Sequence, residues 1–236
     1  PITHLVGKSI VLGEWQKAAL TFMAKSSRYE HPESRQARQT LRDTQDYEEA
    51  LGYFPPKLVY ERQMLVHLAR QRTDFIGAFH RLPKKLCQLF VQAYQSYLFN
   101  KFLSERIRRG LPLRRPLRRD HKMKMNGEDR AALPLIGYKQ ALSVGEQGEI
   151  ERRILDEEGV EPQNFKVSGM RQISSPGGLR TALAPIIDLH IERPSEDEMN
   201  LGKKSVNLSF TLRKGSYATV VLREFMKPKN PTKAGF

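Results

Sequence analysis

A long helical pattern in the middle of the chain, from about Pro83 to Arg109, limits the possible folds more than any other segment. Proline suits the first turn of a helix and glycine the position after its end, and Pro83 and Gly110 occupy these places. Apolar residues cover most of the circumference of this helix, so we expect much of it to be buried. They are Leu86, Leu89, Phe90, Ala93, Tyr94, Tyr97 and Leu98. At 236 residues the chain can build a sizeable core around this helix.

Several shorter segments also carry apolar residues at helical spacing. The pattern predicts helices at Glu14–Lys25, Ser34–Leu51 and Leu58–Arg72, and a surface helix at Gly148–Glu158. The pair Pro55-Pro56 separates two of these helices, because proline ends a helix and restricts the residue before it. These segments give the chain a substantial helical content.

Other segments favour strands. Ile2–Leu12 alternates loosely between apolar and polar residues, and Leu133–Tyr138 is a short apolar run. Leu179–Arg193 and Ser205–Arg213 also indicate β structure, and the strict alternation of the second is typical of a half-buried antiparallel strand. A last helix is expected after residue 215, with Ser216 as its N-cap. The pattern as a whole predicts a mixture of helices and antiparallel strands.

Positive charge is concentrated in two segments. The net charge is +14, from 40 Lys and Arg against 26 Asp and Glu. Residues 101–125 contain ten Lys or Arg and two acidic residues, and residues 201–236 contain eight against one, while the rest of the chain is near neutral. A basic run is often no more than a solvated surface. Two such runs in one chain nevertheless favour a polyanionic partner, namely nucleic acid.

Several other classes of function lack support in the sequence. The single cysteine, Cys87, can form neither an internal disulfide nor a cysteine metal cluster, and a reducing cytoplasm is the simplest compartment. The six histidines are scattered, without the spacing of a metal site. No phosphate loop, dinucleotide fingerprint or membrane-spanning apolar run occurs. The residue patterns alone therefore predict a soluble, basic domain of mixed α and β structure that binds RNA or DNA, without a metal or a membrane.

Two stretches carry a more specific signal. Val91–Arg106 contains AYQSYLFN followed by LSER, and Phe210–Phe225 contains KGSYAT followed by LRE. Both resemble motifs of the TruD family of tRNA pseudouridine synthases. Pro1–Lys8 and Ile173–Arg180 resemble two further blocks of that family. The four matches lie in the order of the family, so the resemblance spans nearly the whole chain.

This resemblance implies an RNA-modifying enzyme that isomerises a uridine in tRNA to pseudouridine, with tRNA as its partner and with no metal or organic cofactor. It implies an α+β fold in which a mixed or antiparallel catalytic sheet is interrupted by a large α+β insertion domain. We expect residues 1–30 to belong to the catalytic domain, residues 31–185 to form the insertion, and residues 186–236 to return to the catalytic domain. The chain then corresponds to the C-terminal part of such an enzyme.

Within the second motif, the resemblance implies residues that contact the substrate. Tyr217 matches the aromatic position that contacts the target base, although a tyrosine in this place is otherwise more often part of a core. Arg223 is expected to support the site by its charge, and Lys214 and Arg213 are expected at its rim. Arg213 also replaces the proline that is usual in the family, which bears on the rigidity of this loop.

The segment after the long helix is expected to contact the RNA backbone, because residues 114–119 indicate an extended arm with four arginines. Arg106, at the end of the helix, is consistent with either a structural ion pair or an RNA contact. Tyr94 and Tyr97 are expected in the core rather than beneath a base. The expected backbone contacts are Arg106, Arg114, Arg115, Arg118 and Arg119.

The catalytic aspartate that the family implies has no match in this chain. In the family it lies in a G-x-K-D-type motif that precedes the block matched by Pro1–Lys8, and none of the eight aspartates here has that context. We therefore expect no catalytic residue among these residues and no activity from them alone. One alternative is a basic domain that binds structured RNA without modifying it. A DNA-binding regulator has less support, because no helix-turn-helix spacing occurs.

Overall fold

The structure is a computed structural model that describes residues 2–213, 215–231 and 233–235. The chain divides into two compact units, Pro1–Ala182 and Leu183–Phe236. Both units combine α-helices with antiparallel strands, which confirms the predicted α+β fold class. The division lies close to the boundary expected between residues 185 and 186. Residues 2–30 pack within the first unit, and their assignment to a catalytic domain stays a prediction.

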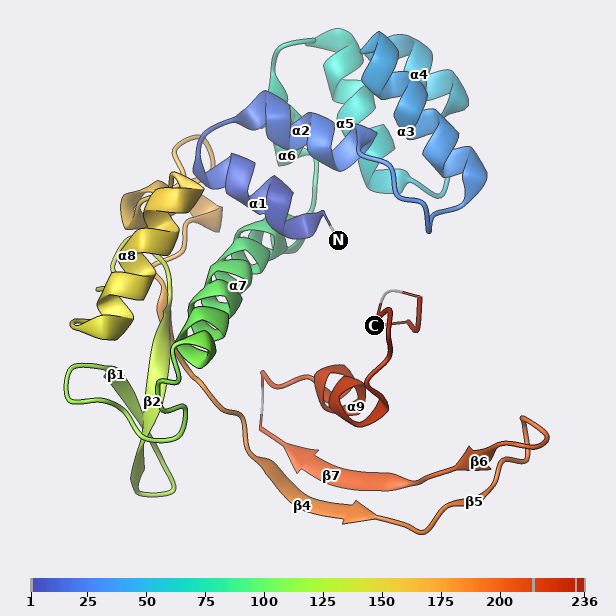
Figure 1. Ribbon diagram of the computed structural model, residues 1–236. Helices are drawn as coiled ribbons and strands as arrows, with labels where there is room; N and C mark the ends of the chain where they lie inside the picture. The colour runs from blue at the N-terminus through green and yellow to red at the C-terminus, as the bar shows by residue number, and fades with distance from the viewer. Residues whose placement is uncertain (1, 214, 232, 236) are drawn as a thin grey trace. The chain divides into compact units, whose positions relative to one another are not determined.

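The first unit is built around the long helix α7 (Lys84–Arg108), which confirms the helix predicted there. Figure 1 shows α1 and α8 beside α7, and α3, α4 and α5 grouped together. The helices predicted at 14–25, 58–72 and 148–158 are confirmed as α2, α5 and α8. The other helical elements are α1 (Thr3–Val11), α2 (Trp15–Ala24), α3 (Pro32–Thr44), α4 (Tyr47–Tyr53), α5 (Val59–Arg70), α6 (Phe75–His80), α8 (Glu146–Glu158) and two short 3-10 turns, η1 (Pro162–Phe165) and η2 (Arg171–Ile173).

The helix predicted over Ser34–Leu51 is in fact two helices. α3 ends at Thr44, and Gln45 takes a left-handed backbone conformation with φ of 50°. The carboxylate of Asp46 then accepts hydrogen bonds from the backbone N–H groups of Glu48 and Glu49 at the start of α4. Because an aspartate N-cap satisfies donors that a helix start leaves without a partner, a new helix begins at this point.

The strand predicted over Ile2–Leu12 is wrong, because this segment forms helix α1. Val6 and Ile10 lie one helical turn apart, and both are buried where α1 packs on α7. Gly7 approaches the backbone carbonyl of Phe90 so closely that a Cβ atom at this position would collide with it. The packing against α7 therefore overrides the strand preference of the β-branched residues.

Three antiparallel strands pack beside α7 in the order β1-β2-β3: β1 (His121–Met125), β2 (Glu128–Leu135) and β3 (Gly178–Thr181). Asn126 and Gly127 join β1 to β2 with φ values of 50° and 81°, which is a two-residue hairpin turn. The strand predicted at Leu133–Tyr138 overlaps the end of β2. The sequence-based prediction missed β1, although an Asn-Gly pair is the usual signal for such a hairpin.

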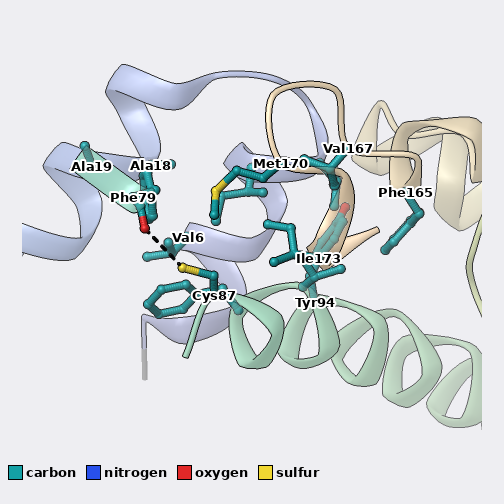
Figure 2. Close-up of a cluster of buried hydrophobic side chains, with 14 of the residues drawn as sticks. Val6, Ala18, Ala19, Phe79, Cys87, Tyr94, Phe165, Val167, Met170 and Ile173 are labelled. Atoms are coloured by element: carbon teal, nitrogen blue, oxygen red, sulfur yellow. Dashed lines mark hydrogen bonds between the residues drawn. The ribbon is translucent and has the colours of Figure 1, made fainter. Parts of the chain in front are cut away.

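The core of the first unit extends from α1 and α2 across α7 to the segment that follows α8 (Figure 2). Cys87 lies within it, with its Sγ atom 3.6 Å from the carbonyl oxygen of Phe79. Burial raises the pKa of this thiol to about 11, so the cysteine is a protonated core residue. The side chains labelled in Figure 2 are Val6, Ala18, Ala19, Phe79, Cys87, Tyr94, Phe165, Val167, Met170 and Ile173.

The described residues of the second unit form two small antiparallel sheets and one helix. β4 (Ile186–Ile191) pairs with β7 (Leu208–Leu212), with an irregularity between Ile187 and His190, and β5 (Ser195–Glu196) pairs with β6 (Lys204–Ser205). These strands confirm the β structure predicted over 179–193 and 205–213. The helix α9 (Ala218–Met226) confirms the last predicted helix.

The start of α9 differs from the prediction. Tyr217, not Ser216, occupies the N-cap position, and no side chain caps the helix there.

None of the residues that the structure describes in the second unit is fully buried, so its apolar side chains are at best half-buried. Over the described part of the whole chain, no helix has both the length and the apolar character needed to span a bilayer.

Candidate nucleic-acid interface

A basic arm, residues 111–120, joins the end of α7 to β1 (Figure 1). The arm contains no helix or strand, and its four arginine side chains at positions 114, 115, 118 and 119 are exposed. Among these four arginines, Arg114 alone has a carboxylate of the described residues within 4 Å, that of Glu128 at 3.9 Å. These guanidinium groups therefore face solvent with little charge compensation, which suits contact with phosphates.

The hairpin that follows the arm continues the positive charge. Lys122 and Lys124 lie two residues apart on β1, so they share one face of the strand, and both are exposed. Lys122 Nζ lies 2.7 Å from Asp129 Oδ2 on β2. This hydrogen bond, with the charges of both lysines, holds the pKa of Asp129 below its ordinary value.

Three more arginines converge on one carboxylate near the end of α7. Arg108 donates to both oxygens of Glu105 at 2.6 and 2.8 Å, Arg109 donates to it at 3.1 Å, and Arg153 of α8 lies 2.8 Å away. The hydrogen bond from Arg108 and the surrounding positive charge hold the pKa of Glu105 below its ordinary value. The sequence-based prediction missed this cluster, because Arg153 is distant in sequence from the other members.

Arg106 occupies a different environment from the other arginines of this region. Its side chain is fully buried, and its guanidinium group donates hydrogen bonds to the Pro112 carbonyl, the Asp120 carboxylate and the Gln147 side chain. Of the two alternatives that the sequence left open, the structure shows the ion pair. The expectation that Arg106 contacts the RNA backbone is therefore corrected, because a guanidinium without solvent access cannot reach a phosphate.

The residues expected to contact the target base lie in the second unit. Tyr217, at the start of α9, is 68% exposed, so no residue described in this chain buries it in a core. Arg223 is exposed on the same helix, with its guanidinium 3.8 Å from Glu224. Arg213 is also exposed, at the end of β7, and Lys214 lies outside the described residues. An accessible aromatic face followed by arginine is compatible with contact to a base.

Tyr94 and Tyr97 were expected in the core. Tyr94 is fully buried, and the half-buried ring of Tyr97 stacks on His4 with ring centroids 4.7 Å apart. Both hydroxyl groups point to the carboxylate of Glu158, which also lies 2.7 Å from each of Lys8 Nζ and Lys101 Nζ. Burial raises the pKa of the Tyr94 hydroxyl. These tyrosines are therefore structural, and Glu158 is the centre of a network that no local pattern could reveal.

One cavity of the first unit lies along α2. It has a volume of about 850 Å³ and is open to solvent along α2, where Trp15, Leu20, Lys25 and Arg42 are among its lining residues. None of the residues expected to contact substrate lines it. In the described part of the chain, no three His, Cys, Asp or Glu side chains are grouped so that they could hold a metal ion.

The fold and the exposed residues together define an α+β protein whose first unit exposes a basic arm and whose second unit exposes Tyr217 and nearby arginines, which are features of proteins that contact nucleic acid. The model of the family described as tRNA pseudouridine synthase D (TruD) matches residues 1–132 and 125–225. The chain therefore belongs to the TruD family, which confirms the resemblance of its motifs.

Individual relatives agree with this assignment. The chain is 44% identical over 227 residues to a protein of Methanopyrus kandleri, and 38% identical over 254 residues to one of Methanococcoides burtonii, each described as "Probable tRNA pseudouridine synthase D". These matches cover 96% of this chain but 54% and 57% of the relatives, so the chain spans about half of their length. A crystal structure of a Methanosarcina mazei protein assigned as tRNA pseudouridine synthase D is 38% identical, with a TM-score of 0.88 over 99% of this chain and 59% of its own.

Proposed function

We propose that this chain functions within a tRNA pseudouridine synthase, binding the tRNA backbone through the basic arm and contacting the target uridine through Tyr217. The observation that carries the proposal is the exposure of Tyr217 within the family motif, since a tyrosine kept only for packing is normally covered. Membership of the TruD family supports the reaction class. No metal or organic cofactor is part of the proposal.

The physical demands of the reaction fit these features. A uracil in folded RNA is stacked and paired, so an enzyme must turn the nucleotide out before it can detach the base and rejoin it through carbon. The extruded base needs an aromatic face, which Tyr217 offers, and the backbone needs cations that neutralise its phosphates. We assign the second role to the arginines of the basic arm, and we assign Arg223, Arg213 and Lys214 to the surroundings of the base.

The nucleophilic aspartate of the reaction is proposed to come from sequence outside these 236 residues. Six of the eight aspartates make local contacts that give their carboxylates a structural role, so no catalytic role is needed to account for them. Asp46 and Asp74 cap helices, Asp43, Asp120 and Asp129 pair with basic side chains, and Asp197 accepts hydrogen bonds from its own turn. A nucleophile needs an open approach to the substrate, which a capping or ion-paired carboxylate lacks.

A basic domain that binds structured RNA without modifying it is the second candidate. The exposed arm favours it, because four arginines can bind phosphates whether or not chemistry follows. The two candidates agree on RNA binding and differ on pseudouridine formation.

Both candidate functions include RNA binding, which is tested by the salt dependence of the affinity for tRNA. We expect log K for the chain to fall linearly with log salt, with a slope of roughly 0.7–0.9 for each phosphate contact. Replacing Arg114, Arg115, Arg118 and Arg119 together with alanine should weaken binding and make the slope shallower by roughly three, since four contacts are removed. Binding can be followed by fluorescence anisotropy of labelled tRNA between about 50 and 200 mM salt.

A matched control removes the same charge elsewhere. Arg28, Arg42, Arg70 and Arg72 are exposed arginines of the helical region, and their joint replacement with alanine should leave the slope nearly unchanged. If both quadruple variants behave alike, the arm is only a solvated surface and its assigned role is wrong.

A further inference from the structure

A chain of buried hydrogen bonds links the end of α7 to the basic arm and to α8. Arg106 Nε and Nη2 both donate to the Pro112 carbonyl, at 2.9 and 2.6 Å. Nη2 also lies 2.6 Å from Asp120 Oδ2, and Nη1 lies 3.0 Å from Gln147 Oε1. Arg106 therefore holds both ends of the arm, because Pro112 lies near its start and Asp120 is its last residue.

The partner carboxylate also organises the arm itself. The side chain of Asp120 is only 2% exposed, and the same Oδ2 atom accepts a hydrogen bond from the Leu117 backbone N–H at 2.8 Å. The Asp120 N–H in turn donates to the Leu117 carbonyl at 3.1 Å. Residues 117–120 are thus a closed turn that Arg106 fixes to the helix, and Arg118 and Arg119 project from that turn.

The network continues into the loop that precedes α8. Gln147 donates to Glu151 at 3.0 Å, and Glu151 accepts two more hydrogen bonds from Ser143, through its N–H at 2.7 Å and its hydroxyl at 2.8 Å. These three side chains are all buried. The backbone N–H of Val144 then donates to the Arg119 carbonyl at 3.3 Å. The arm is therefore fixed on both sides by one connected set of polar contacts.

We propose that Arg106 and Asp120 are positioning residues for RNA binding: they hold an arm without helix or strand in one conformation, so that its four exposed arginines meet the phosphates at a fixed spacing. This inference rests on the proposed function of the arm. Side chains and loops that are ordered before binding lose less conformational entropy when they bind, which strengthens the complex without adding a contact. Arg106 thus acts on RNA through other residues and does not touch it.

The test uses Asp120→Asn in the whole 236-residue chain, because asparagine keeps the size and one acceptor oxygen while removing the charge that pairs with Arg106. Glu61→Gln is the matched control. It removes the charge from another buried ion pair of the first unit, Arg38–Glu61 at 2.6 Å, which lies among the helices α3 and α5. Both variants lose a comparable internal interaction, and only Asp120→Asn affects the arm.

At fixed salt and at a temperature where circular dichroism shows both variants folded, Asp120→Asn should bind tRNA about tenfold more weakly than wild type, which is about 1.4 kcal/mol. Amide hydrogen exchange of residues 112–120 should become faster in this variant. Glu61→Gln should leave both quantities unchanged. Unchanged affinity and exchange in a folded Asp120→Asn variant would overturn the inference. If that variant does not fold, Gln147→Met provides the test, because it removes one acceptor of Arg106 and keeps the ion pair.

A combined variant separates failure of this inference from failure of the proposed function. Adding Asp120→Asn to the variant in which the four arm arginines are alanine should weaken binding no further, because the positioned groups are already absent. A further loss as large as in the wild-type background would show that Asp120 acts by another route and would overturn the inference alone. If the four-alanine variant binds tRNA as wild type does, the arm has no role in binding, and the inference falls with the proposed function.

Discussion

Glu158, the last residue of α8, ties three helices together through its contacts with Lys8 of α1 and with Tyr94, Tyr97 and Lys101 of α7. Burial by itself raises the pKa of this carboxyl, but the hydrogen bonds and charges of Lys101 and Lys8 outweigh burial and hold the pKa below its ordinary value. The ionised form is therefore the one that the folded state stabilises.

Glu158→Gln should consequently change how stability depends on pH. The folded-state pKa lies below the unfolded value of about 4.3, so the stabilisation is fully present above that pH and is lost as pH falls through the folded pKa. Urea midpoints of the variant, measured from about pH 6 to about pH 3, should fall less steeply than those of wild type, with a loss of about 1–3 kcal/mol at neutral pH. Glu149→Gln, an exposed position on the same helix, should follow wild type. Parallel curves for Glu158→Gln and wild type would contradict this role.

Tyr217 can be tested in an enzyme of the relatives' length that contains these residues. Tyr217→Phe should keep most of the single-turnover rate, because the aromatic face remains. Tyr217→Ala should lose about 1–3 kcal/mol of stacking, or roughly 5- to 150-fold in rate. In the 236-residue chain Tyr217 is 68% exposed, so neither change should lower the melting temperature of that chain. An alanine variant that melts early but modifies tRNA normally while folded would remove Tyr217 from the site.

At the scale of secondary-structure elements, the contact between α1 and α7 depends on Gly7. A Cβ atom there would collide with the Phe90 carbonyl of α7, and the backbone of a packed helix cannot move away easily. Gly7→Ala should therefore lower the free energy of unfolding by about 1–3 kcal/mol, as measured by urea denaturation. Gly52→Ala in α4 is the control, because no atom lies within 4 Å of its added Cβ, and alanine should stabilise that helix by about 0.5–1 kcal/mol. A Gly7→Ala variant as stable as wild type would show that α1 does not pack as described.

The elements that the sequence predicted correctly are those whose signal is local. α2, α5 and α8 each carry an apolar stripe at helical spacing, and α7 is apolar around most of its circumference, which is visible without knowledge of their neighbours. α1 was mistaken for a strand because its β-branched residues alternate loosely, and the reason for its helical form is Gly7 against α7, a contact between segments far apart in sequence. Within the candidate interface, the exposure of the arm arginines was predictable from their density. The burial of Arg106 was not, because its sequence neighbours do not show which carboxylate it pairs with.

At the scale of the whole molecule, the two units differ in how their side chains are covered. The buried hydrophobic residues that the structure describes all lie in the first unit, and the described residues of the second are at best half-buried. The two parts of the proposed activity are assigned to different units, since the basic arm belongs to the first and Tyr217 with Arg223 to the second. Substitutions can therefore separate binding of tRNA from contact with the target base.

Chemical mapping of pseudouridine in unmodified tRNA tests the proposed function most directly. The tRNA is incubated in parallel with the 236-residue chain and with a protein of the relatives' length that contains it. We predict pseudouridine with the longer protein and none above a no-protein control with the chain alone, although the chain should still bind the tRNA. Pseudouridine formed by the chain alone would contradict the proposal that the catalytic aspartate lies outside these residues. No pseudouridine from the longer protein, despite tRNA binding, would instead favour the non-catalytic RNA-binding domain.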